Sequence, residues 1–102
     1  MPTRYRGIYL IDGFRVERFD FDIMVVASML HRAAHGHTDA SAEELRAGLG
    51  FLQARLDDWV DSEVDCEFFD EAVFNMCKAA VMEYRARWPT TVDYKILDRD
   101  EE

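Results

Sequence analysis

The sequence has few cysteines, which could form disulfide bonds, and few glycines, which could form a phosphate-binding loop. Two of its 102 residues are cysteine, and Cys66 and Cys77 lie 11 positions apart with no C-x-x-C pair. This spacing favours reduced thiols packed in a core over a disulfide framework. The five glycines are scattered and form no glycine-rich loop after a strand, so nucleotide binding has no support.

Long apolar runs are also missing. The longest strongly apolar stretch, residues 23–30, has 8 residues, whereas a membrane-spanning helix needs about 20. The N-terminal apolar run, residues 8–11, is too short for the core of a signal peptide. We therefore expect a cytoplasmic protein with no membrane contact. Ten of the twelve cations are arginine, a bias that points to a GC-rich bacterial or phage gene.

What the chain does contain is enough apolar surface for one core. Apolar residues make up 49% and aromatic residues 13% of the sequence, more than a disordered acidic segment carries. A chain of 102 residues has the length of one domain. We expect a single acidic domain over residues 1–102, with an acidic tip at 98–102.

Local patterns predict an α+β fold with the element order β-β-α-α-α-β. Residues 4–19 indicate two strands joined at Asp12-Gly13, a dipeptide typical of two-residue hairpin turns, with Phe14 and Val16 on the buried face. Residues 90–98 alternate apolar and polar side chains, which predicts a strand that returns to this hairpin. The expected sheet is three-stranded and mostly antiparallel, with helices packed on one face.

The first of three predicted helices spans residues 20–36. Asp20 or Asp22 can cap its start, and Gly36 supplies a left-handed stop. Because its opening residues 23–27 are apolar on all sides, we expect this helix to be the central buried one.

The second and third helices carry continuous apolar stripes. A capping box at Ser41 and Glu44 marks the start of the second helix. The third runs from about Cys66 to Trp88, where Pro89 forces its end. The expected stripes are Leu45, Leu49, Leu52, Leu56 and Trp59 on the second helix, and Phe69, Val73, Met76, Ala80 and Tyr84 on the third.

The negative charge is confined to the C-terminal part of the chain. Residues 1–56 hold seven acids and seven bases, while residues 57–102 hold fourteen acids and five bases and so carry the whole net charge of −9. This balance argues against direct binding of nucleic acid or an anionic membrane, and it favours a basic partner.

The densest acidic stretch, residues 57–71, has eight carboxylates and no cation. Its later acids, such as Glu67, Asp70 and Glu71, lie near the start of the third predicted helix, where the helix dipole favours anions. The earlier acids lie at the end of the second helix, where each anion costs about 0.3–1 kcal/mol. Carboxylates one helical turn apart are spaced by about 5.4 Å along the helix axis, the same order as the spacing of phosphates along a nucleic-acid strand.

Because the acids at the end of the second predicted helix do not stabilise the fold, we expect that they have been selected for binding a partner. The candidate partner-binding residues are Asp57, Asp58, Trp59, Asp61, Glu63, Asp65, Glu67 and Phe68. Trp59 and Phe68 are the candidate aromatic anchors among them. The alternative is a solvated surface with no partner. Calcium binding is disfavoured because the stretch lacks the glycine of an EF-hand loop.

The charge pattern predicts a small non-enzymatic protein that docks on and blocks a basic, nucleic-acid-binding surface of another protein. Phage anti-defence proteins of the anti-CRISPR type and nucleic-acid mimics share this size and charge, an analogy of type that no motif carries. Alternatives are an immunity protein or antitoxin that neutralises a basic toxin, a structural or assembly subunit, and a metal-binding protein built on histidines. Monomer and homodimer both stay open.

All three histidines lie close together in the sequence. His31 and His35 share a helix face, and His37 and Asp39 follow, a spacing that can chelate zinc. Arg32 stands where a zincin carries its catalytic glutamate, which excludes metalloprotease chemistry. A helix C-terminus favours His31 and His35 without any metal. We therefore expect no metal or other cofactor, with a histidine metal site as the alternative.

No catalytic residue is predicted. Ser28 precedes His31 by one helical turn, but no G-x-S-x-G elbow surrounds it. No sequence feature ties either cysteine to a histidine that would act as its base. We expect no enzymatic activity.

Overall fold

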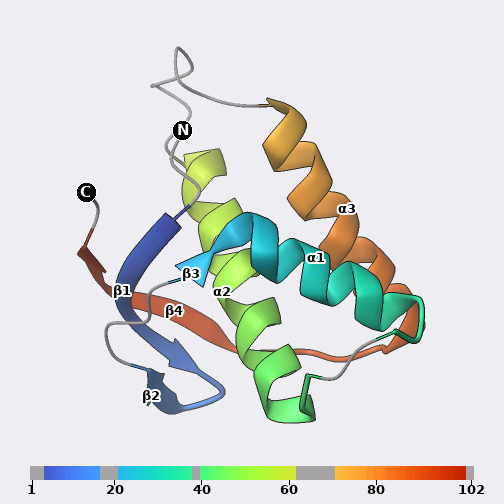
Figure 1. Ribbon diagram of the computed structural model, residues 1–102. Helices are drawn as coiled ribbons and strands as arrows, with labels where there is room; N and C mark the ends of the chain where they lie inside the picture. The colour runs from blue at the N-terminus through green and yellow to red at the C-terminus, as the bar shows by residue number, and fades with distance from the viewer. Residues whose placement is uncertain (1–3, 17–20, 38–39, 62–70, 101–102) are drawn as a thin grey trace.

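The computed structural model describes residues 4–16, 21–37, 40–61 and 71–100 of the chain (Figure 1). Its elements in chain order are β1 (Arg4–Ile11), β2 (Phe14–Val16), β3 (Phe21–Asp22), α1 (Ile23–Ala34), α2 (Ala42–Asp61), α3 (Glu71–Arg87) and β4 (Tyr94–Asp100). The predicted α+β class is confirmed, as is the order of the strands and helices. The structure adds the two-residue strand β3 directly in front of α1, within the segment assigned to the first predicted helix.

The strand β1 is the centre of the sheet and pairs antiparallel with each of the other strands. The hairpin to β2 closes with Ile11 opposite Phe14. Asp12 has a φ of 52° and Gly13 a φ of 84°, the backbone that a two-residue turn of this kind requires. The predicted hairpin turn is confirmed.

The last strand returns to β1, as the alternation of residues 90–98 predicted. Its pairs run from Arg6 opposite Asp100 to Ile11 opposite Tyr94, with an irregularity in register between Ile8 and Tyr9. Leu97 falls at this irregularity and is 44% exposed, which is the position of the extra residue in a β-bulge.

Both predicted helix starts use the expected side chains. Asp22 Oδ1 accepts a hydrogen bond of 2.8 Å from the backbone N–H of Met24 and caps α1. Ser41 Oγ accepts a hydrogen bond of 3.1 Å from the backbone N–H of Glu44 and caps α2. The Ser41 hydroxyl also donates to the Glu44 carboxylate at 3.3 Å. Gly36, with a φ of 78°, follows the end of α1 as predicted.

The central buried helix is α2, and the expectation that residues 20–36 would take this place is wrong. In α2, Leu49, Phe51 and Leu52 are at most 1% exposed, whereas Val25 in the apolar start of α1 is 67% exposed. The reason is the position of α2, which contacts β1 and β4 as well as α1 and α3. All three helices lie on one side of the sheet (Figure 1).

The buried faces of β2 and α3 differ in detail from those that the sequence patterns predicted. Phe14 was expected in the core, but it lies directly after the hairpin turn and is 76% exposed. On α3, Met76 is 41% exposed while Cys77 and Val81 are buried with Ala80 and Tyr84. The inward face of α3 is therefore rotated by about one residue from the expected stripe. The part of the predicted third helix from residue 66 to residue 70 lies outside the described residues.

Within the described residues, no helix has both the length and the apolar character needed to cross a membrane.

Candidate functional site

Three of the eight candidate partner-binding residues can be placed with their side chains. Asp57, Asp58 and Trp59 lie near the end of α2, and Asp61 is the last residue of this helix. The remaining four candidates, Glu63, Asp65, Glu67 and Phe68, lie outside the described residues. The structure thus places the beginning of the acidic stretch on one helix end and leaves its function a prediction.

Asp57 has a role in packing that the sequence did not indicate. The hydroxyl of Tyr94 on β4 donates a hydrogen bond of 2.5 Å to Asp57 Oδ2. This hydrogen bond, together with partial burial and the nearby Asp57 charge, raises the pKa of Tyr94 to about 12. Asp57 therefore joins the end of α2 to the sheet.

Trp59 lies at the margin of the core. It is half-buried, and its ring centroid is 6.3 Å from that of Phe74 on α3. This ring contact anchors the end of α2 against α3. The role of Trp59 in binding a partner stays a prediction.

The end of α2 differs in charge from the ends of the other two helices. The last turn of α1 contains His31 and Arg32, and the last turn of α3 contains Arg85 and Arg87. Cations there interact favourably with the helix dipole. The last turn of α2 contains no basic residue and ends on acids instead.

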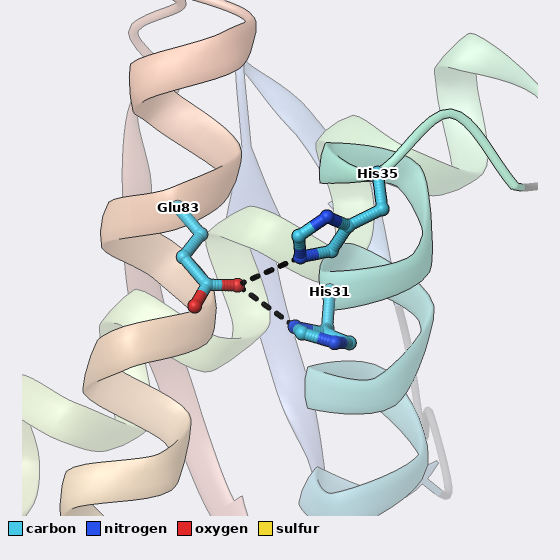
Figure 2. Close-up of side chains that lie close together, drawn as sticks. All are labelled: His31, His35 and Glu83. Atoms are coloured by element: carbon cyan, nitrogen blue, oxygen red, sulfur yellow. Dashed lines mark hydrogen bonds and ion pairs between the residues drawn. The ribbon is translucent and has the colours of Figure 1, made fainter.

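A second group of polar side chains lies between α1 and α3. Figure 2 shows His31 and His35, one helical turn apart on α1, facing Glu83 on α3. His31 Nδ1 lies 2.7 Å and His35 Nε2 lies 3.7 Å from the same carboxylate oxygen, Glu83 Oε2. The two imidazole rings meet at a centroid distance of 4.5 Å and an angle of 62°.

The composition of this group corrects the pattern seen in the sequence. His31 and His35 share a face as predicted, but His37 does not belong to the group, and its third member is Glu83. Because Glu83 is 52 positions from His31 in the chain, no local motif could have indicated it. The close packing of α1 against α3 brings these residues together.

The group is accessible and carries ligand types that divalent metal ions accept. The exposed fractions of the three side chains are 55% for His31, 58% for His35 and 46% for Glu83. One ligand atom from each residue can be chosen so that all lie within 4.8 Å of one another. Imidazole nitrogen and carboxylate oxygen are the ligands of many zinc sites.

Cys77 is unsuited to nucleophilic chemistry. It is fully buried on α3, and burial, together with the charge of Asp22, raises the pKa of its thiol to about 11. Since the thiolate is the reactive form, Cys77 is inert at neutral pH. The expected core packing is confirmed for Cys77, while Cys66 lies outside the described residues.

No protein-family model, curated protein or solved structure matches this chain. The functional assignment therefore depends on the chemistry of the residues themselves.

Proposed function

We propose that this chain is a small, non-enzymatic acidic binding protein that docks on a basic, nucleic-acid-binding surface of another protein and blocks it. The observation that supports the proposal is the accumulation of acids at the C-terminal end of α2. The first and third helices end on basic residues, as the helix dipole favours, and the second does not.

The acids at this helix end lie where the helix dipole disfavours negative charge. Asp57 and Asp61 stand at i and i+4, a spacing at which like charges repel by a few tenths of a kcal/mol. Asp57 has a structural reason in its hydrogen bond with Tyr94. A lysine- or arginine-rich partner would interact favourably with the negative charge at this helix end.

The wider charge distribution supports the same partner. Residues 57–102 carry the entire net charge of −9, so one part of the chain is strongly acidic while the rest is balanced. A field of one sign speeds the association with an oppositely charged surface and repels nucleic acid. Acids one turn apart along a helix, about 5.4 Å, present anionic charge at intervals similar to those of a phosphate backbone.

The test removes charge from the proposed interface without removing the contact with Tyr94. The test variant is Asp58→Asn/Asp61→Asn, and the matched control is Glu43→Gln/Glu44→Gln in the first turn of α2. Each pair removes two negative charges from the same helix. Glutamine at position 44 retains the cap because a capping box accepts glutamine as well as glutamate.

The readout is capture of partners by the immobilised full chain from a lysate, with elution in a salt gradient. We expect the wild type and the control to retain a basic nucleic-acid-binding protein, with DNA or RNA displacing it. The test variant should release that protein at lower salt. Equal elution from both variants, or a captured partner that is indifferent to salt and to nucleic acid, would contradict the proposal. A basic toxin as the retained protein would favour the immunity-protein alternative.

A further inference from the structure

We propose that His31, His35 and Glu83 form a binding site for a divalent transition-metal ion, zinc foremost, that clips α1 to α3. The site is independent of the acidic end of α2, since none of its three residues belongs to that helix. Two of the ligands come from one helix and the third from its neighbour (Figure 2).

The distances within the group are those of a site that is close to its bound geometry. Zinc binds histidine nitrogen and carboxylate oxygen at about 2.0–2.2 Å, so two ligands at a tetrahedral angle lie about 3.4 Å apart. The distances from Glu83 Oε2, 2.7 Å to His31 Nδ1 and 3.7 Å to His35 Nε2, lie on either side of this value. The three ligand atoms all lie within 4.8 Å of one another. Bringing the most distant pair to the separation found in a zinc site therefore requires a relative movement of at most about 1.4 Å.

The surroundings permit such a movement and hold the two helices in place during it. About half of each ligand side chain is exposed, so small rotations cost little and solvent can complete the coordination. At the adjacent helix ends, Trp88 Nε1 donates a hydrogen bond of 3.3 Å to the backbone carbonyl of Ala33. This contact fixes the end of α3 against α1 and reduces the ordering that a bound ion must supply.

The ligand types select the class of ion. Imidazole nitrogen suits zinc, copper and nickel, whereas magnesium and calcium are bound mainly through oxygen. With two nitrogens and one carboxylate, the site should discriminate against both alkaline-earth ions. A bound ion would replace the hydrogen bond between His31 and Glu83, because it would be coordinated by both of these side chains.

A simple surface contact is the competing explanation of the same geometry. An exposed histidine and glutamate can form a hydrogen bond that contributes little to stability. The two explanations differ in their response to zinc, to the identity of the ion and to the loss of one ligand. His37 provides a matched control, because it lies close in the chain and is exposed but is no member of the group.

The experiment is calorimetric titration of the untagged full chain, dialysed against a chelator, with zinc chloride at neutral pH. Magnesium and calcium chloride serve as comparison ions. The variants are His35→Ala, Glu83→Gln and the control His37→Ala, with circular dichroism to show that each is folded. Glutamine at position 83 removes the charge but can still hydrogen-bond with His31.

We expect the wild type and His37→Ala to bind one zinc ion and to gain thermal stability with added zinc. His35→Ala and Glu83→Gln should each bind zinc at least about tenfold more weakly, and neither magnesium nor calcium should bind at the site. Cobalt bound to the wild type should show the visible absorption of a low-coordinate complex, lost in both ligand variants. Absence of zinc binding, or equal weakening in His37→Ala, would overturn the proposal.

Discussion

The guanidinium of Arg55 lies wholly inside the core and donates a hydrogen bond of 2.9 Å to the hydroxyl of Tyr9. Both residues have an exposed fraction of 0%, and Arg55 Cζ lies 5.6 Å from the centre of the Tyr9 ring. The ring in turn meets that of Phe51 edge-on at 4.9 Å. Because a buried charge is costly unless it is hydrogen-bonded, the pair fixes α2 on the central strand β1.

We expect Tyr9→Phe to lower the free energy of unfolding by about 1–3 kcal/mol, because the variant withdraws a hydrogen-bond partner from a buried charge. Arg55→Met should also destabilise the protein, since the Tyr9 hydroxyl then loses the hydrogen bond from Arg55. The double variant should be less unstable than the two single effects added together, because both substitutions remove the same hydrogen bond. Urea denaturation measures all three. Additivity within about 0.5 kcal/mol would show that the pair is not coupled.

Two glycines inside α2 should respond to alanine to different degrees. A Cβ on Gly50 would lie 2.7 Å from Ile11 Cδ1, 3.2 Å from Ile11 Cγ2 and 3.3 Å from Val92 Cγ1, so two stiff, branched side chains would have to give way. A Cβ on Gly48 would lie 2.6 Å from the flexible end of Met29, which can move aside, and 3.3 Å from Val26 Cγ1, so one branched side chain would have to give way.

We therefore expect Gly50→Ala to lower the free energy of unfolding by about 1–3 kcal/mol through overpacking. Gly48→Ala should cost less than Gly50→Ala, because it crowds only one branched side chain, that of Val26, and the better helix propensity of alanine offsets up to about 1 kcal/mol. Urea denaturation of the two variants provides the comparison, and each is the control for the other. An equal loss of stability in both would show that close packing against the sheet is not what distinguishes Gly50.

Local signals in the sequence were sufficient for the order of all the elements except the two-residue strand β3. The Asp12-Gly13 turn, the cap at Ser41 and the stop at Pro89 each act over a few residues, and the structure confirms the hairpin and the helix boundaries that they predicted. Local hydropathy was not sufficient to rank the helices by burial. Val25 lies in the most apolar stretch of the chain and is 67% exposed, because burial depends on which elements pack against a helix.

The long-range side-chain contacts of the two candidate sites could not be predicted from the sequence for the same reason. Glu83 meets His31 across 52 positions of the chain, and Tyr94 meets Asp57 across 37. The spacing of His31 and His35 was a visible signal, but the third member of the group, Glu83, lies on another helix. A carboxylate on another helix becomes a candidate only when the packing of α1 against α3 is known.

A charged contact ties α2 to the hairpin turn and should make stability depend on pH. Arg46 donates two hydrogen bonds to Asp12 Oδ2, at 2.9 and 2.6 Å, and the backbone N–H of Asp93 donates to Asp12 Oδ1 at 3.1 Å. The hydrogen bond with Arg46, followed by that with Asp93, holds the pKa of Asp12 below its ordinary value of 3.8. This stabilisation is present above that value and is lost as the pH falls through the lowered pKa.

We expect wild type to be more stable than Asp12→Asn at neutral pH, and the difference to vanish in strong acid. Asparagine suits the replacement because it tolerates the positive φ of this turn position. Urea midpoints of both proteins over an acid pH series measure the difference, and Asp93→Asn is a control at a neighbouring exposed acid. A difference that stays constant as the pH falls would mean that the charge of Asp12 contributes nothing.

The contact between Tyr94 and Asp57 should be visible at the opposite end of the pH scale. The carboxylate accepts the phenol hydrogen and repels a phenolate, which raises the pKa of Tyr94 from 10.0 to about 12. Asp57→Asn keeps an acceptor oxygen but removes the charge, so the pKa of Tyr94 should fall back toward its ordinary value. Asp58→Asn removes the same charge one residue further along and should leave Tyr94 unchanged.

Because folding raises this pKa, the stabilising effect of the contact is complete below about pH 10 and is lost as the pH rises through about 12. The difference in free energy of unfolding between wild type and Tyr94→Phe should follow this course, starting from about 1 kcal/mol. Ultraviolet titration of the tyrosines, assigned by comparison with Tyr94→Phe, gives the pKa directly. If Asp57→Asn and wild type titrate alike, the end of α2 is not held to β4 by this hydrogen bond.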